Sequence, residues 1–97
     1  MGYNISILDH ANNDLFVISN ALSQYGENPQ KVFFENFRKF VNTISNMPLL
    51  YSKYNNSKFR KAAIAYDYVA FYQVNKKTKT VEVHRIFSSK QNIDGLL

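Results

Sequence analysis

Three short segments rich in β-branched and aromatic residues lie between positions 58 and 90, and they restrict the fold more than any other part of the chain. They cover residues 58–64, 66–74 and 80–87. Because the connections between them are short, these segments predict an antiparallel meander of three strands. Arg60, His84 and Arg85 lie in this meander, and His84 is one of only 2 histidines in the chain. We therefore expect any functional site to lie on this sheet.

The chain before the meander changes from a strand pattern to a helix pattern. Residues 3–8 largely alternate between apolar and polar side chains, which predicts a first short strand. Asp9 then stands where a helix N-cap is expected. The apolar residues that follow recur at spacings of three and four, the period of an amphipathic helix. They are Ala11, Leu15, Ile18, Leu22 and Tyr25. Gly26 predicts the end of this helix in a left-handed conformation.

A second helix follows after a short connection. Asn28-Pro29 is typical of a helix cap followed by proline in the first turn, and Pro48 ends the helical pattern. Its apolar stripe is Phe33, Phe37, Phe40, Ile44 and Met47. Two helices joined so closely should pack as an antiparallel hairpin. The sequence therefore predicts an α+β fold in the order β-α-α-β-β-β, with the hairpin on one face of a small, mostly antiparallel sheet and the other face partly open.

Strict alternation predicts which side chains share a face of the sheet. In the middle strand, one face carries Tyr66, Tyr68, Ala70, Tyr72 and Val74, and the other Asp67, Val69, Phe71 and Gln73. Both faces are apolar, so this strand should be central. In the last strand, one face carries Val81, Val83, Arg85 and Phe87, and the other Glu82, His84 and Ile86. On the helices, Phe16, Val17, Phe34 and Val41 lie beside the main stripes, where they either widen the core or form an exposed apolar patch.

Composition limits the class of protein. The 97 residues predict a single domain over residues 1–97, and 45% hydrophobic with 20% charged residues is typical of a globular protein. The chain contains no cysteine, only 2 histidines and 3 scattered glycines, so we expect no disulfide, no metal site, no phosphate loop and no cofactor. No apolar run approaches the roughly 20 residues of a membrane helix, so we expect a cytoplasmic location without a membrane partner. The net charge of +5 favours an anionic partner if it does more than keep the surface hydrated.

The order and spacing of several segments resemble the ParE/RelE family of bacterial type II toxins. Those segments are Asp14-Leu15, Pro29 with Phe33-Phe34 and Phe37, Ile44 with Pro48, Tyr68–Val74 and Val81–Phe87. The resemblance implies a toxin neutralised by a cognate antitoxin. ParE-like members poison DNA gyrase, a topoisomerase, by binding, whereas RelE-like members cut messenger RNA in the ribosome. The helical hairpin is more similar to the ParE-like branch, which we take as the leading hypothesis.

The alternative, a ribosome-dependent mRNA endonuclease, needs an acid, a base and cations around the phosphate. A set could be assembled from Arg60, His84, Arg85 and Lys90. The nucleases resembled here carry an arginine after the tyrosine of the central strand, where this chain has Val69. Under simple alternation His84 and Arg85 face opposite ways and share a pocket only if a bulge intervenes. We therefore keep His84, Arg85 and Lys90 as catalytic candidates only.

A second set of residues is expected to bind the target or the antitoxin. It consists of Lys58, Arg60, Lys61, Arg85 and Phe34. Each arginine can bind a carboxylate or phosphate with two hydrogen bonds, or it can pair internally with Glu82, Asp67 or a helix acid. The predicted hairpin tip is basic, with Lys76, Lys77 and Lys79. Lysines at such a tip more often keep the turn hydrated than bind a partner.

Overall fold

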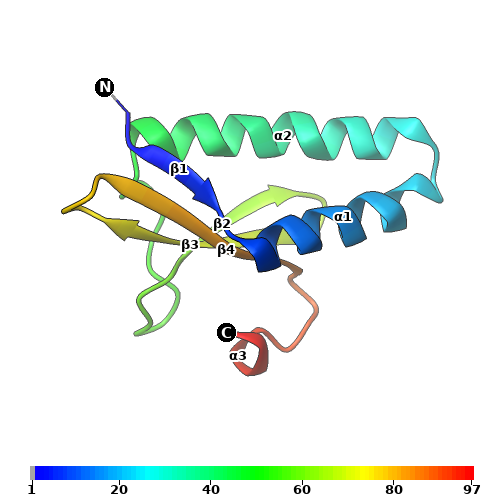
Figure 1. Cartoon of the computed structure of the whole chain (residues 1–97). Helices are drawn as coiled ribbons and strands as arrows, with labels where there is room; N and C mark the ends of the chain where they lie inside the picture. Colours follow the sequence, from blue (N-terminus) through cyan, green and yellow to red (C-terminus); the bar gives the residue numbers. More distant parts are fainter. Residues whose placement is uncertain (1) are drawn as a thin grey trace.

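The computed structural model describes residues 2–97 and contains two layers, a helical hairpin and a four-stranded sheet (Figure 1). The elements are β1 Asn4–Ile7, α1 Asp9–Ser23, α2 Glu27–Asn46, β2 Arg60–Ala65, β3 Tyr68–Asn75, β4 Thr80–Ser88 and α3 Ile93–Leu96. This order confirms the predicted α+β fold, with α3 added as one short turn of helix. No helix within residues 2–97 is both long and apolar enough to cross a bilayer.

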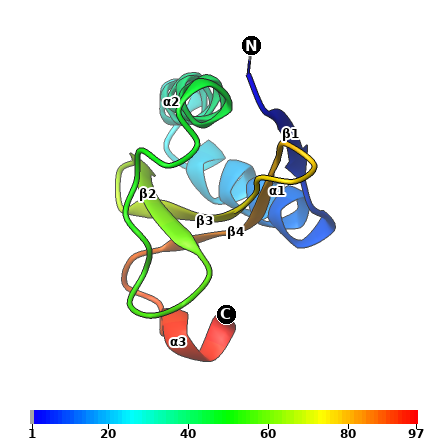
Figure 2. The same ribbon diagram turned by 90° about the vertical axis from the view of Figure 1, so that its left-hand side faces the viewer.

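The sheet has the strand order β1-β4-β3-β2. β1 runs parallel to β4, and the other two pairs are antiparallel. The hairpin of α1 and α2 lies on one face, which we call the inner face, and α3 lies on the opposite, outer face (Figures 1 and 2). The sheet is therefore mostly antiparallel, as the sequence predicts, and β3 is a central strand.

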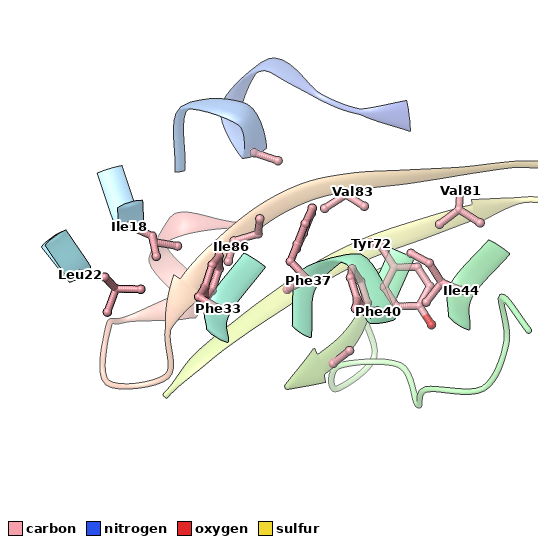
Figure 3. Close-up of a cluster of buried hydrophobic side chains, with 13 residues drawn as sticks. Ile18, Leu22, Phe33, Phe37, Phe40, Ile44, Tyr72, Val81, Val83 and Ile86 are labelled. Carbon is pink, nitrogen blue, oxygen red and sulfur yellow. The ribbon is translucent and has the colours of Figure 1, made fainter. Parts of the chain in front are cut away.

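The main core lies between the hairpin and the inner face (Figure 3). Four residues of the predicted α2 stripe are buried, and so are the inner-face residues Ala70 and Tyr72 of β3. The buried stripe is Phe33, Phe37, Phe40 and Ile44. Each such side chain contributes roughly 1.5–3 kcal/mol by leaving water, so this stripe fixes α2 on the sheet. Tyr25 and Met47, at the ends of the predicted stripes, are exposed because the helices end before them.

The turn between the helices depends on Gly26, whose φ of +98° is disfavoured for any residue with a side chain. Gly26 precedes α2 directly, so the predicted cap at Asn28 is wrong. The predicted cap at Asp9 is wrong as well, because α1 already begins at Asp9 and Leu8 is the preceding, extended residue. Asp9 instead lies in the first turn, where a negative charge suits the helix dipole.

A β-bulge in β4 overturns the predicted alternation of that strand. Phe71 pairs with Arg85 and Tyr72 pairs with Val83, so His84 is an extra residue. Val83 therefore belongs to the main core, and Ile86, predicted to face away from it, joins the same core. Arg85 is opposite the outer-face residue Phe71, on the same face as His84.

The outer face is more covered than the sequence predicts. Val69, Phe71, Phe87 and Ile93 form a second buried cluster, with Tyr54 and Phe59 packed against it. Ile93 belongs to α3, so the C-terminal segment covers this face, and the Tyr54 hydroxyl donates to Asp94 Oδ1 at 2.7 Å. The predicted faces of β3 are confirmed, because its alternate residues divide between the two clusters.

Candidate functional site

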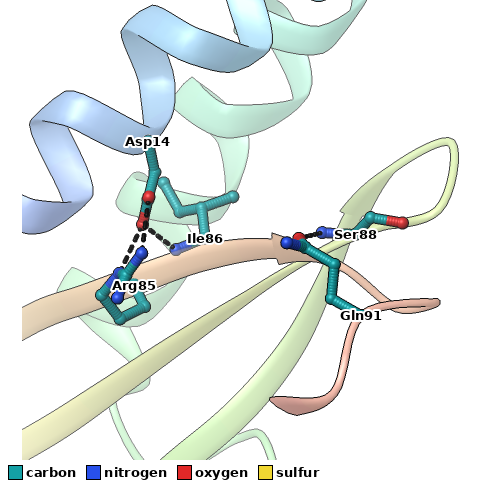
Figure 4. A network of polar contacts seen from close by, with 5 residues as sticks. All are labelled: Asp14, Arg85, Ile86, Ser88 and Gln91. Atoms are coloured by element: carbon teal, nitrogen blue, oxygen red, sulfur yellow. Dashed lines mark hydrogen bonds and ion pairs between the residues drawn. The ribbon is translucent and has the colours of Figure 1, made fainter. Parts of the chain in front are cut away.

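The strongest polar contact joins α1 to β4. Arg85 donates through Nε to Asp14 Oδ2 at 2.8 Å and through Nη2 to Asp14 Oδ1 at 2.9 Å (Figure 4). This two-bond geometry is the strongest form of an arginine–carboxylate pair. The hydrogen bonds to Asp14 raise the pKa of Arg85, so the guanidinium keeps its charge. The alternative in which Arg85 pairs with a helix acid is therefore the one that the structure adopts.

The sheet edge explains why Asp14 is needed there. β1 ends at Ile7, which lies opposite Val83, so the rest of β4 has no strand on that side. The Ile86 N–H donates instead to Asp14 Oδ2 at 2.9 Å. A buried N–H without a partner costs about 1–3 kcal/mol, so this carboxylate completes the sheet edge as well as neutralising Arg85.

Two open cavities flank Arg85. The first, of about 240 Å³, lies between α1 and the end of β4, and Val17, Ala21 and Leu96 contribute to its walls. The second, of about 230 Å³, is lined by Leu8, His10, Phe59, His84, Arg85, Leu96 and Leu97. The bulge thus brings His84 and Arg85 into one cavity, the arrangement that simple alternation excluded.

His84 is held mainly by apolar contact. Its ring meets Phe59 edge-on at 5.0 Å between centroids, and Nε2 lies 3.5 Å from Glu82 Oε1. Nε2 is buried and forms no hydrogen bond within the described chain. A catalytic base or acid must lie within reach of the group whose proton it takes or gives. Neither Arg60 nor Lys90 lines the cavity that contains His84. The four residues of the proposed nuclease set therefore do not converge.

Arg60 lies in a different part of the sheet. It pairs with Tyr72 across β2 and β3, and its Nη1 donates to the Tyr51 carbonyl oxygen at 2.8 Å. Two lysines lie beside it in the sequence. The Nζ of Lys58 is 5.5 Å from the ring centroid of Phe59, and the Nζ of Lys61 is 5.6 Å from that of Tyr54. These three residues form a basic region along the start of β2, separated from Arg85.

The apolar candidates divide into two groups. Phe34 is half-buried and packs against Phe33 with a centroid distance of 5.2 Å, and Val41 also packs against the core. Phe16 and Val17 on α1 are 67% and 56% exposed. The off-stripe residues thus widen the core on α2 and leave an apolar patch on α1.

Sequence reasoning named Asp14 only through the family resemblance and gave it no role. A signal was present, since Asp14 is three residues after Ala11 and four before Ile18, on the buried side of the helix. An acid at such a position needs a buried partner. Within residues 2–97 no three histidine, cysteine or acidic side chains are grouped in a way that could hold a metal ion.

Comparison with known proteins places this geometry in a family. A search among curated proteins finds no significant match. Solved structures share the fold at low identity. A chain of the chromosomal ParDE toxin-antitoxin system of P. aeruginosa aligns with a TM-score of 0.68 and 14% identity, covering 89% of this chain and 95% of that one.

Complexes of RelE with RelB share the fold as well. A chain of the archaeal RelE–RelB complex from Pyrococcus horikoshii gives a TM-score of 0.64 at 16% identity, covering 94% of this chain and 99% of that one. A chain of the intact E. coli RelBE toxin-antitoxin complex gives a TM-score of 0.64 at 14% identity, covering 92% of this chain and 99% of that one. The family model for the ParE toxin of type II toxin-antitoxin systems, parDE, matches residues 5–93. The chain therefore belongs to the ParE toxin family of type II toxin-antitoxin systems and has the ParE/RelE toxin fold.

Proposed function

We propose that this toxin inhibits DNA gyrase by binding, and that a cognate antitoxin neutralises it. One observation carries the proposal: the cation that a nuclease would aim at the phosphate, Arg85, is held in a two-bond ion pair with Asp14. Arg60, His84 and Lys90 do not surround it. Catalysis of phosphodiester cleavage requires preorganised charge at the reacting phosphate, so this arrangement supports a binding role.

The apolar surface on α1 supports a protein partner. Phe16 and Val17 are exposed. Between Ala11 and Gln24 the one charged side chain is Asp14, and Arg85 neutralises it. Interface centres are typically depleted in charge and enriched in aromatic residues. The cavity beside Val17 gives such a partner a recess, and we assign this surface to the antitoxin.

A supercoiling assay tests the gyrase proposal. Purified toxin should inhibit supercoiling of plasmid DNA by gyrase or trap cleaved DNA, while relaxation of the same plasmid by a type I topoisomerase continues. The inhibition should disappear when the antitoxin is added first. Absence of any effect with the toxin in stoichiometric excess over gyrase would refute the proposal.

One observation favours the endonuclease alternative: His84 and Arg85 line the same cavity. This function predicts codon-phased cleavage of messages in the ribosomal A site. It also predicts that His84→Gln, which removes no hydrogen bond of the described chain, lowers cleavage and toxicity. Undiminished toxicity of that variant would exclude a catalytic His84.

A further inference from the structure

We propose that the cavity between the start of β2 and the hairpin that joins β3 to β4 is a binding site for the phosphodiester backbone of a nucleic acid. This cavity has a volume of about 240 Å³. Its walls are formed by Leu49, Lys53, Lys58, Arg60, Gln73, Val74 and Lys76. Four of these seven residues are cationic, and none is acidic.

The fold assembles this site from three separate segments. Lys53 and Lys58 come from the connection between α2 and β2, Arg60 is the first residue of β2, and Lys76 comes from the hairpin between β3 and β4. In sequence the lysines at 76–79 resemble an ordinary hydrated turn. The antiparallel pairing of β2 with β3 brings one of them to the same cavity as Arg60.

The cations have no internal partner. Within residues 2–97 the close contacts between basic and acidic side chains are Arg85 with Asp14 and His84 with Glu82, and neither involves the cavity. Glu82 is the nearest acid by register, because it lies opposite Gln73, but its carboxylate faces His84. The site therefore carries an uncompensated positive potential, which attracts an anion.

Backbone pairing places two of the cationic residues opposite each other. Lys53, in the connection before β2, forms an isolated antiparallel bridge with Arg60, the first residue of β2. Like charges at such positions destabilise the pair, and a bound anion removes the repulsion. The guanidinium of Arg60 is oriented by its bond to the Tyr51 carbonyl, and its remaining N–H groups are available to a phosphate oxygen.

A nucleic acid fits this site better than a single small anion. Three of the cations are exposed lysines, two from the connection before β2 and one from the β3–β4 hairpin, which suit successive phosphates along a strand, and Arg60 provides one fixed contact. Neither Val69 nor Lys90, two positions where nuclease residues were sought, lines this cavity. The inference rests on neither proposed target, because it needs only the toxin and a nucleic acid.

The test measures fluorescence anisotropy of two labelled probes, a short DNA duplex and a single-stranded RNA, with the full chain. The site variant is Lys53→Gln/Lys58→Gln/Lys76→Gln. The control is Lys31→Gln/Arg38→Gln/Lys39→Gln, which changes three exposed cations of α2 and gives the same net charge. Arg60 stays unchanged in both, so the backbone of the cavity is preserved, and thermal unfolding of both variants verifies their folding.

The site variant should bind DNA, RNA or both about 10-fold or more weakly, and the slope of log K against log salt should become shallower by about 2–3. The control should change affinity less than about 3-fold. The two probes distinguish DNA from RNA as the source of the backbone. Equal weakening by both variants, or no measurable binding of either probe, would overturn the inference.

Discussion

Replacing Asp14 by alanine tests whether one carboxylate both neutralises Arg85 and completes the edge of β4. Asp14 accepts three hydrogen bonds, two from the Arg85 guanidinium and one from the Ile86 N–H. Its side chain is 11% exposed and that of Arg85 is 26% exposed, so water can replace part of the arginine contact but little of the backbone contact.

The expected loss follows from these contacts. The unpaired, buried Ile86 N–H costs about 1–3 kcal/mol. Breaking a fully buried ion pair costs about 3–5 kcal/mol, which partial exposure of Arg85 reduces. We therefore expect Asp14→Ala to lower the free energy of unfolding by about 2–4 kcal/mol. For a domain of this size this lowers the Tm by roughly 10–20 °C.

Urea denaturation of Asp14→Ala, Arg85→Ala and the double variant measures the contributions separately. Arg85→Ala should cost less than Asp14→Ala, because the Ile86 N–H keeps its acceptor. The coupling energy should be about 1–2 kcal/mol. Glu35→Ala, which removes an exposed acid of α2, is the matched control and should stay within about 0.5 kcal/mol of the unmodified chain. A similarly small effect of Asp14→Ala would refute the reasoning.

Three further predictions concern other parts of the chain. Gly26→Ala should lower the free energy of unfolding by about 1–2 kcal/mol in urea denaturation, because no atom crowds the position and only its φ of +98° is strained. Burial raises the pKa of Tyr72 above 10.0, so the unfolded chain releases this proton first and stability should fall as pH rises above that value. Tyr72→Phe, which also loses the bond to the Pro48 carbonyl, should flatten that fall in denaturation curves measured across alkaline pH. Phe16→Ala should leave the Tm unchanged but weaken antitoxin binding about 10-fold or more in calorimetric titration, and unchanged affinity would remove α1 from the interface.

The parts of the fold that the sequence predicts are those whose pattern is set by one large apolar surface. The α2 stripe and the two faces of β3 are fixed by burial, and their periods are visible along the chain. The bulge in β4 has no such local signal. It lies where the pairing with β1 ends, because Ile7 is opposite Val83 and His84 is the next residue of β4, and no glycine or proline marks the position.

The pairing of Arg85 illustrates a second limit. Its partner, Asp14, is 71 residues away, and the periodicity of a single sequence does not indicate which acid on which element will lie beside it. From the sequence alone, Glu82, Asp67 and the acids of the helices are chemically equivalent partners for Arg85. The choice was made by the early end of β1, which leaves the Ile86 N–H free and so requires an acceptor from α1.

The cations of this chain therefore cannot be treated as one basic surface. Arg85 is neutralised by the Asp14 carboxylate, so detaching it for a ligand would break a two-bond ion pair and leave a largely buried carboxylate without its counter-ion. Lys53, Lys58, Arg60 and Lys76 have no acid to lose, and Lys53 and Arg60 are like charges at opposite backbone positions. An anion entering the first region costs stability, whereas an anion entering the second relieves repulsion. Electrostatic binding by this toxin should consequently occur in the cavity lined by Arg60 rather than at Arg85, even though Arg85 has the sequence position expected for a functional cation.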